Sequence, residues 1–339
     1  MKRWDLTLLV ILILEICIFA YANPKFLMPR VIFGSINDII PICIISLFVT
    51  MVMITAGIDI QAGAVVGLSS IIVGVTWQDL GLNIWVASLV AIIIAALVGL
   101  LTGYIVAYYQ VQPMVVTLGG SFLYAGLALL ISTLSSTESY KGISGFPESF
   151  VNFASYRIGG VLPVQVVVFL VMAAFAWFLL HKTKYGRKIF LIGINQNAAE
   201  YSGINTRFII MSTYVLSGIA AAVSGILLTS YLGTAKSDLG ATITLPIITA
   251  VVLGGTLMTG GKGSIIGTAL AAVIIGVLKF GLPLCFRVNM QYLDIPVGLL
   301  LLIVISARAL SNRPEVIVFI SNLKKKLDTK QDLPLIKTT

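Results

Sequence analysis

The chain is poor in charge and in histidine, and each shortage excludes a class of protein. Charged residues make up 10% of the 339 residues, and 58% are hydrophobic. A typical soluble domain has roughly 25% charged residues, so a soluble globular chain and a disordered chain are both excluded. The single histidine, His181, rules out multi-histidine metal sites and most His-based catalysis. It follows an apolar run, where a helix C-terminus favours a structural histidine.

Cysteine is also scarce. Cys17, Cys43 and Cys285 lie far apart, in or beside apolar runs, with neither zinc-ligand spacing nor a disulfide framework. We expect them to be small buried apolar residues.

Motifs for nucleotide binding and catalysis are missing too. The nearest approach to a phosphate-binding loop, residues 256–263, lacks the first glycine and the hydroxyl residue after Lys262. No nucleophile, base and orienting group form a set. We therefore expect no enzyme activity, and no metal or cofactor bound by this chain.

Long apolar runs dominate what is present. A helix needs about 20 mostly apolar residues to cross a bilayer, and the chain offers ten such candidates. They are 5–22, 37–56, 62–78, 84–109, 114–134, 162–181, 208–231, 241–257, 264–281 and 292–309. The expected fold class is all-α, a polytopic membrane protein with about ten spans. The short segments 62–78 and 241–257 are candidates for half-helices or re-entrant segments.

The first span raises two questions. Lys2 and Arg3 precede it and residues 20–22 resemble a signal-peptidase site, but the apolar chain continues at once, so we expect an uncleaved anchor. Glu15 lies in mid-span, where a buried acid is costly. It could be a proton or ion relay; we favour a packing or interfacial role.

The surplus of basic residues predicts an orientation. The formal charge is +9, and ten spans place 15 of the 22 Lys and Arg residues on one side and six on the other. Basic residues gather on the cytoplasmic side, so both termini are expected there. We expect residues 1–310 to form a single transmembrane domain and 311–339 a basic cytoplasmic tail near anionic lipid. Nucleic acid is not an expected partner.

The polar segment 182–207 predicts a short helix over roughly 198–202, capped by Asn195 or Asn197 and stopped by Gly203. Such a helix is too short to be stable alone in water. It therefore needs a partner surface, and small side chains at Ala198 and Ala199 permit close docking. The alternative is an ordinary structured loop.

We expect the interior of the bundle to be lined mainly by Gly, Ala, Ser and Thr, which favours a path for a neutral polar solute. Thr117, Ser121, Thr249 and Thr268 are candidates to line it. Asp59 stands at a glycine-rich junction between two spans and is expected to face the bundle interior.

Four motifs in this order carry a family resemblance over about residues 5–310. They are Ile54–Ile60, Gln112–Gly119, Gly186–Ile204 and Ala250–Thr268. With them, the chain resembles the membrane subunits of ribose-type ABC importers. Ala56 and Gln61 depart from the usual Gly-Gly-Ile-Asp-Leu-Ser form of the first motif, which weakens a sugar-path role at those two positions.

Within that family the chain is most similar to the D-type permeases of autoinducer-2 importers. The similarity rests on His181–Thr183, Phe190–Gly193, Gly145–Pro147 and Ser237–Ala241. If the resemblance holds, the solute is autoinducer-2. Two alternatives remain: a permease for ribose or a similar sugar, and a stand-alone secondary carrier.

The resemblance implies a set of partners in the bacterial inner membrane. Two cytoplasmic ABC ATPase subunits would use ATP, a related C-type permease would form a heterodimer with this chain, and a periplasmic binding protein would deliver the solute. The implied ATPase-coupling residues are Gly186, Arg187, Gly193, Asn195, Ala198, Ala199, Ser202 and Gly203. Together with Asp59 and Gln61 of the first motif, the hydroxyl residues Thr117, Ser121, Thr249 and Thr268 make up the candidate path residues.

Overall fold

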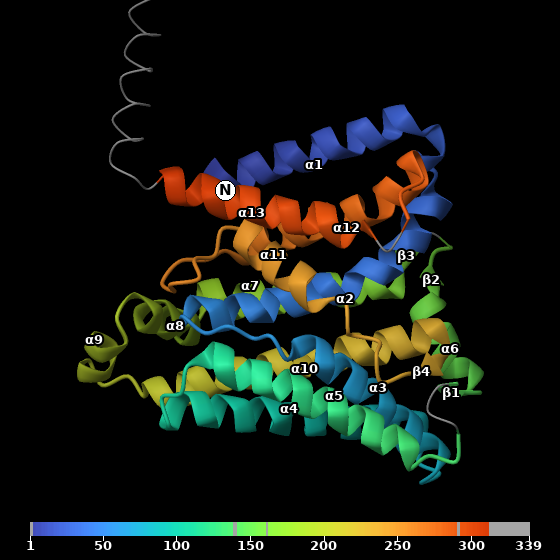
Figure 1. The fold of residues 1–339 in the computed structure, drawn as a ribbon, viewed down its shortest axis with the longest axis horizontal. Helices are drawn as coiled ribbons and strands as arrows, with labels where there is room; N and C mark the ends of the chain where they lie inside the picture. Colours follow the sequence, from blue (N-terminus) through green and yellow to red (C-terminus); the bar gives the residue numbers. More distant parts are fainter. Residues whose placement is uncertain (1–2, 138–140, 161, 290–291, 312–339) are drawn as a thin grey trace, which may run out of the picture.

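The computed structural model describes residues 3–137, 141–160, 162–289 and 292–311, and shows a bundle of helices with roughly aligned axes (Figure 1). The helices are α1 (Arg3–Ala22), the 3-10 helix η1 (Pro24–Leu27), α2 (Pro29–Ile54), α3 (Ala62–Gln78), α4 (Ile84–Tyr108), α5 (Pro113–Thr133), α6 (Glu148–Ser155), α7 (Val164–Lys182), α8 (Lys184–Ile194), α9 (Gln196–Tyr201), α10 (Thr206–Leu232), α11 (Thr244–Leu253), α12 (Ile265–Phe286) and α13 (Asp294–Ser311). Four two-residue strands, β1 (Ile143–Ser144), β2 (Arg157–Ile158), β3 (Leu162–Pro163) and β4 (Thr234–Ala235), form the antiparallel pairs β1–β4 and β2–β3. The predicted all-α class is confirmed.

Each of the ten expected spans contains one helix. Six of them, α1, α4, α5, α7, α10 and α12, are long and apolar enough to cross a membrane. The expected span at 241–257 contains only α11, which has ten residues and therefore a length of about 15 Å. That is half of a hydrocarbon core of about 30 Å, so α11 has the length of a half-helix. The number of crossings stays a prediction.

The helix ends follow from local sequence. Asn83, Asn205 and Ser264 each precede a helix, and their side-chain oxygens accept a hydrogen bond from a backbone N–H of its first turn. Proline occupies the first position of α2 and α5, where its missing N–H costs nothing. Gly233 ends α10 in the left-handed conformation, with φ of 64°.

Helix α10 lies at the centre of the bundle, in contact with α2, α3 and α4. Glycines allow this close approach. A Cβ atom at Gly218 would collide with the carbonyl oxygen of Ala95 in α4, and one at Gly225 would lie 2.6 Å from the carbonyl oxygen of Val66 in α3. Small residues thus bring backbones together where the apolar surroundings provide little hydrophobic driving force between helices.

The two ends of the bundle differ in structure. Helices α8 and α9, the start of α1 and the described end of α13 lie at one end, on the left in Figure 1, and α6, β1 and β4 lie at the other. We call the first the α9 end. Both described chain ends therefore lie at the same end, as an even number of spans requires; the cytoplasmic assignment of that end stays a prediction.

Polar and aromatic contacts order the opposite end. The ring of Phe146 lies 4.8 Å from that of Trp77 and 5.4 Å from that of Phe150, measured between centroids. The Asp79 carboxylate accepts hydrogen bonds from the backbone N–H and hydroxyl of Ser136. The backbone donor of Ser136, above all, lowers the pKa of Asp79 below its ordinary value.

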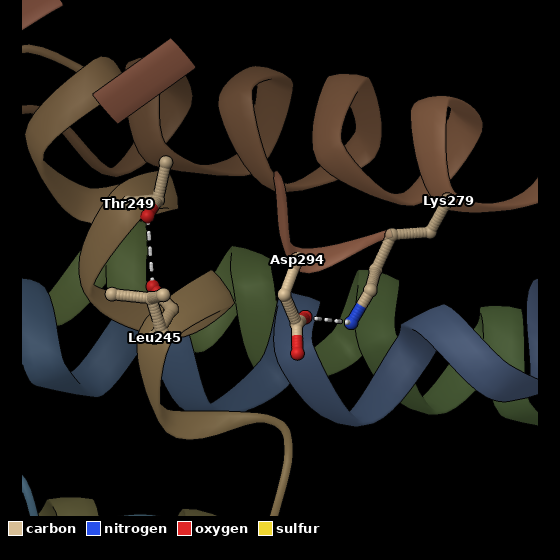
Figure 2. A network of polar contacts seen from close by, with 4 residues as sticks. All are labelled: Leu245, Thr249, Lys279 and Asp294. Carbon is tan, nitrogen blue, oxygen red and sulfur yellow. Dashed lines mark hydrogen bonds and ion pairs between the residues drawn. The ribbon is translucent and has the colours of Figure 1, made fainter. Parts of the chain in front are cut away.

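Helices α1 and α13 each contact the bundle through polar side chains. Lys279 of α12 and Asp294 of α13 form an ion pair of 3.8 Å, drawn in Figure 2. The indole N–H of Trp4 donates to the carbonyl of Leu253 at 2.9 Å. Glu15 differs, because both of its carboxylate oxygens are buried without a hydrogen-bond partner in the described part of the chain. Unlike Trp4 and Asp294, Glu15 therefore does not tie its helix to the bundle through a hydrogen bond or ion pair among the described residues.

We expect Gly218→Val to destabilise the fold by roughly 1–3 kcal/mol, because overpacking at the α4–α10 contact forces the backbones apart. Gly126→Val is the control, since no heavy atom lies within 4 Å of a Cβ at Gly126. Thermal unfolding in detergent measures both variants. An equal loss in the two would contradict the assigned role of the close contact.

Candidate functional site

Residues 55–61 break the helical path between α2 and α3, and their polar side chains are buried among other helices. Asp59 Oδ2 accepts a hydrogen bond of 2.6 Å from the Ser217 hydroxyl of α10. Gln61 Oε1 accepts one of 2.9 Å from the Thr102 hydroxyl of α4. Each of these four residues is at most 2% exposed. The acid at the glycine-rich junction therefore faces the interior, as expected.

The backbone of this break is also satisfied by neighbouring helices. The Thr117 hydroxyl of α5 lies 3.1 Å from the carbonyl oxygen of Ile58, and the Thr244 hydroxyl of α11 lies 3.5 Å from that of Ile60. Irregular backbone inside a membrane bundle persists only where protein or water pairs its polar groups. Hydroxyl groups provide that pairing here.

A second break, residues 254–264 between α11 and α12, meets the first at the α9 end. The backbone N–H of Gly261 donates to the Ile54 carbonyl at 2.9 Å. Gly193 of α8 packs directly on both, since a Cβ there would collide with the Ile54 carbonyl oxygen and the Gly261 nitrogen. The end of α2, the end of α8 and the second break thus form one three-way contact, which we call the junction.

Segment 182–207 contains the expected short helix and one more. Asn195 caps α9, because its side-chain oxygen accepts from the N–H of Ala198 at 3.0 Å, and Gly203 follows with φ of 79°. The alternative cap, Asn197, has no such role. Helix α8 was not predicted. It buries Ile189 and Ile192 against the bundle. This amphipathic pattern could have indicated the helix, but the segment was interpreted from its polar residues.

Helix α8 is attached to the bundle by small and polar residues. Gly186 packs against the carbonyl oxygens of Leu179 and Leu180 at the end of α7. The hydroxyl groups of Tyr185 and Ser212 lie 2.7 Å apart and link α8 to α10. Burial raises the pKa of Tyr185 above its ordinary value. A movement of α8 would therefore be transmitted to α7, α10 and the junction.

Exposed apolar side chains occur on α8, on α9 and in the second break. Leu191, Ile194, Tyr201 and Met258 are 49%, 70%, 93% and 43% exposed. We call these four the apolar face. Of the remaining residues that the resemblance implies, Arg187, Ala198, Ser202 and Gly203 are exposed. Ala199 is buried on the inner side of α9, so the expectation that it offers a docking surface is wrong.

A cavity of about 330 Å³ lies between α9 and the first break. Residues 55–57, 110–113 and 196–197 form most of its wall. Ala56 and Gln110 adopt left-handed backbone conformations, with φ of 63° and 54°. Residues other than glycine rarely do so, so the wall of this cavity contains two strained positions.

The predicted path residues separate into groups. Asp59, Gln61 and Thr117 lie together at the first break. Ser121 lies one turn further along α5, partly exposed, with its hydroxyl donating to the Leu118 carbonyl.

Thr249 and Thr268 lie elsewhere and are fully buried. The Thr249 hydroxyl donates to the Leu245 carbonyl at 2.8 Å (Figure 2), and the Thr268 hydroxyl lies 2.8 Å from that of Thr50. Their role in a path, like that of the first group, stays a prediction. Ser217 and Thr102 were not predicted. A buried acid demands a partner, which Ser217 provides for Asp59, whereas Thr102 bonds to Gln61.

Comparison with known proteins gives consistent matches. Residues 31–305 match the family model described as the branched-chain amino acid transport system / permease component. The Autoinducer 2 import system permease protein LsrD of Yersinia pestis (strain Pestoides F) is 42% identical over 308 residues, which cover 91% of this chain and 92% of the relative. The protein of the same name from Yersinia enterocolitica shows the same identity and coverage.

A solved structure shares the fold. It is a metal-chelate type ABC transporter in an inward-facing conformation, with 13% sequence identity and a TM-score of 0.50. The match covers 88% of this chain and 96% of that one.

The strained residue Ala56 generates a stability prediction. An L-residue in the left-handed region costs roughly 1–2 kcal/mol, which glycine avoids at an entropic cost of roughly 0.5–1 kcal/mol. We therefore expect Ala56→Gly to stabilise the chain by up to about 1 kcal/mol. Ala125→Gly, at an exposed position inside α5, should destabilise it by about 1 kcal/mol. Thermal unfolding midpoints that move in the same direction for both variants would refute the strain assignment.

Proposed function

The chain belongs to the family of the branched-chain amino acid transport system / permease component, and we propose that it is the membrane-spanning subunit of an ABC importer that forms the translocation path for autoinducer-2. The observation that carries the proposal is 42% identity, over 91% of the chain, to relatives named as autoinducer-2 import permeases. Permeases of this kind move a solute and carry out no bond chemistry themselves.

The apolar face supports a coupling role at the α9 end. A six-residue helix cannot be stable by itself, and α9 carries a tyrosine that is 93% exposed. Apolar and aromatic side chains of this kind are typical interface anchors. We assign the apolar face to the docking of a cytoplasmic ABC ATPase subunit, which would hydrolyse the ATP that this chain has no motif to bind.

The contacts beneath the apolar face suggest how docking would affect the path. Gly193 at the end of α8 touches both the end of α2 and the second break. A packed helix shifts as a rigid body rather than deforming. A shift of α8 would thus move both breaks together, along with the buried polar groups of Asp59 and Gln61 that we assign to the path.

The exposed surface of α5 is suited to a second permease subunit. Leu118, Phe122 and Leu130 are 42%, 74% and 57% exposed, and no heavy atom lies within 4 Å of a Cβ at Gly119 or Gly126. We propose that a related C-type permease packs here and encloses the path with this chain. This chain would lie in the bacterial inner membrane with both termini cytoplasmic. A periplasmic binding protein would deliver the solute to the end of the bundle opposite α9.

Tyr201→Ser tests the docking assignment. Removing an exposed aromatic anchor typically costs about 2 kcal/mol, so we expect ATPase binding to weaken by at least about tenfold. Tyr21→Ser is the matched control, since Tyr21 is 95% exposed at the end of α1 away from α9. Co-purification of the ATPase with each variant measures the effect. Equal retention by both variants would remove α9 from the docking surface.

Uptake by a deletion strain tests the solute. We expect loss of this chain to abolish autoinducer-2 uptake and to leave ribose uptake unchanged. Re-expression of the natural chain should restore autoinducer-2 uptake. In a strain that also lacks the partner ATPase, re-expression should not restore uptake. Lost ribose uptake with normal autoinducer-2 uptake would favour the sugar permease. Uptake without any ATPase would favour a stand-alone carrier.

A further inference from the structure

We propose that the cavity between α9 and the first break is a binding site for a small uncharged polyhydroxylated molecule of the sugar type. Its volume of about 330 Å³ falls at the lower end of the range for small-molecule sites, about 300–1,000 Å³. The inference goes beyond the proposed function, because it adds a ligand site at the α9 end of the bundle, where the solute would leave.

Four amide side chains give the cavity its polar character. Gln110, Gln112, Gln196 and Asn197 line it; Gln196 is half-buried, the other three are exposed, and none of their side chains bonds to the described part of the chain. Gln112 precedes α5, and its side chain forms no capping hydrogen bond there. Amides both donate and accept, so unpaired ones fit hydroxyl groups, which do the same.

The rest of the wall restricts the ligand further. Val106, Val111 and Ile210 provide apolar surface beside the amides, which suits the C–H face of a sugar-like molecule. Among the residues that the structure describes, no charged side chain lines the cavity. A phosphate group would find no cation there to offset its desolvation. The wall therefore favours the uncharged form of such a molecule over its phosphate ester.

The location links occupancy to coupling. A ligand that bonds to Asn197 and Gln112 would bridge α9 to the loop before α5, next to the strained residue Ala56. Such a bridge opposes any separation of α9 from the loop before α5. The bound molecule would thus slow the movement that the ATPase drives, so accumulated solute would restrain further import.

Binding of ribose to the purified full-length chain in nanodiscs tests the site without any ATPase. Saturation-transfer NMR should show ribose binding with a Kd on the order of millimolar, and Gln112→Leu should weaken it by about fivefold through one lost hydrogen bond. Asn197→Leu should act similarly. Gln78→Leu is the control, because the Gln78 amide bonds to Ser136 and Thr137 at the opposite end and should leave binding unchanged.

Ribose 5-phosphate tests the charge preference. It should bind more weakly than ribose to the natural chain, and Gln112→Arg should reverse that order. No saturable ribose binding, binding that is indifferent to Gln112→Leu and Asn197→Leu, or tighter binding of the phosphate ester to the natural chain would each overturn the proposal.

A transport assay tests the restraint, and this arm alone rests on the proposed function. Ribose enclosed on the α9 side of vesicles should lower the autoinducer-2 import rate of the assembled transporter, and Gln112→Leu should reduce that inhibition. Import that occurs but ignores the enclosed ribose would overturn the restraint. A chain that binds ribose in the cavity but supports no import would contradict the proposed function instead.

Discussion

The polar groups of residues 55–61 must find partners inside an apolar bundle, and much of the structure depends on this constraint. A helix satisfies its own backbone, but a broken helix does not. Ser217, Thr102 and Thr117, from three different helices, donate to the break. These helices must therefore pass close to it and in one register. The break that could weaken the bundle instead defines how its centre is assembled.

Close packing at glycine carries the same constraint outward. Gly193 and Gly261 bring the end of α8 and the second break against the carbonyl of Ile54. At such distances the backbones leave no room for independent movement. The surface at the α9 end and the interior around Asp59 are thus mechanically connected through backbone contacts, without a long chain of side chains between them.

The sequence predicted the elements of the candidate site better than their contacts. The position of α9 followed from Asn195 and Gly203, because caps and left-handed stops are local features. Helix α8 was missed, since its apolar residues Ile189 and Ile192 come directly after Arg187 and Lys188, and the whole segment was interpreted as a basic loop. Ser217 and Thr102 were missed because their hydrogen bonds to Asp59 and Gln61 join residues far apart in the chain. A single sequence does not indicate which distant residues come into contact.

The sequence by itself determined a helical membrane chain with ten apolar segments and the place of its breaks. Hydropathy, proline, glycine and capping residues act over a few neighbours, so these features can be read in order along the chain. The tertiary structure alone decided that both breaks and α8 meet at one junction, that α11 spans only ten residues, and that four unpaired amides face one cavity. Those outcomes depend on how helices distant in sequence pack together, and packing is settled by the whole bundle at once.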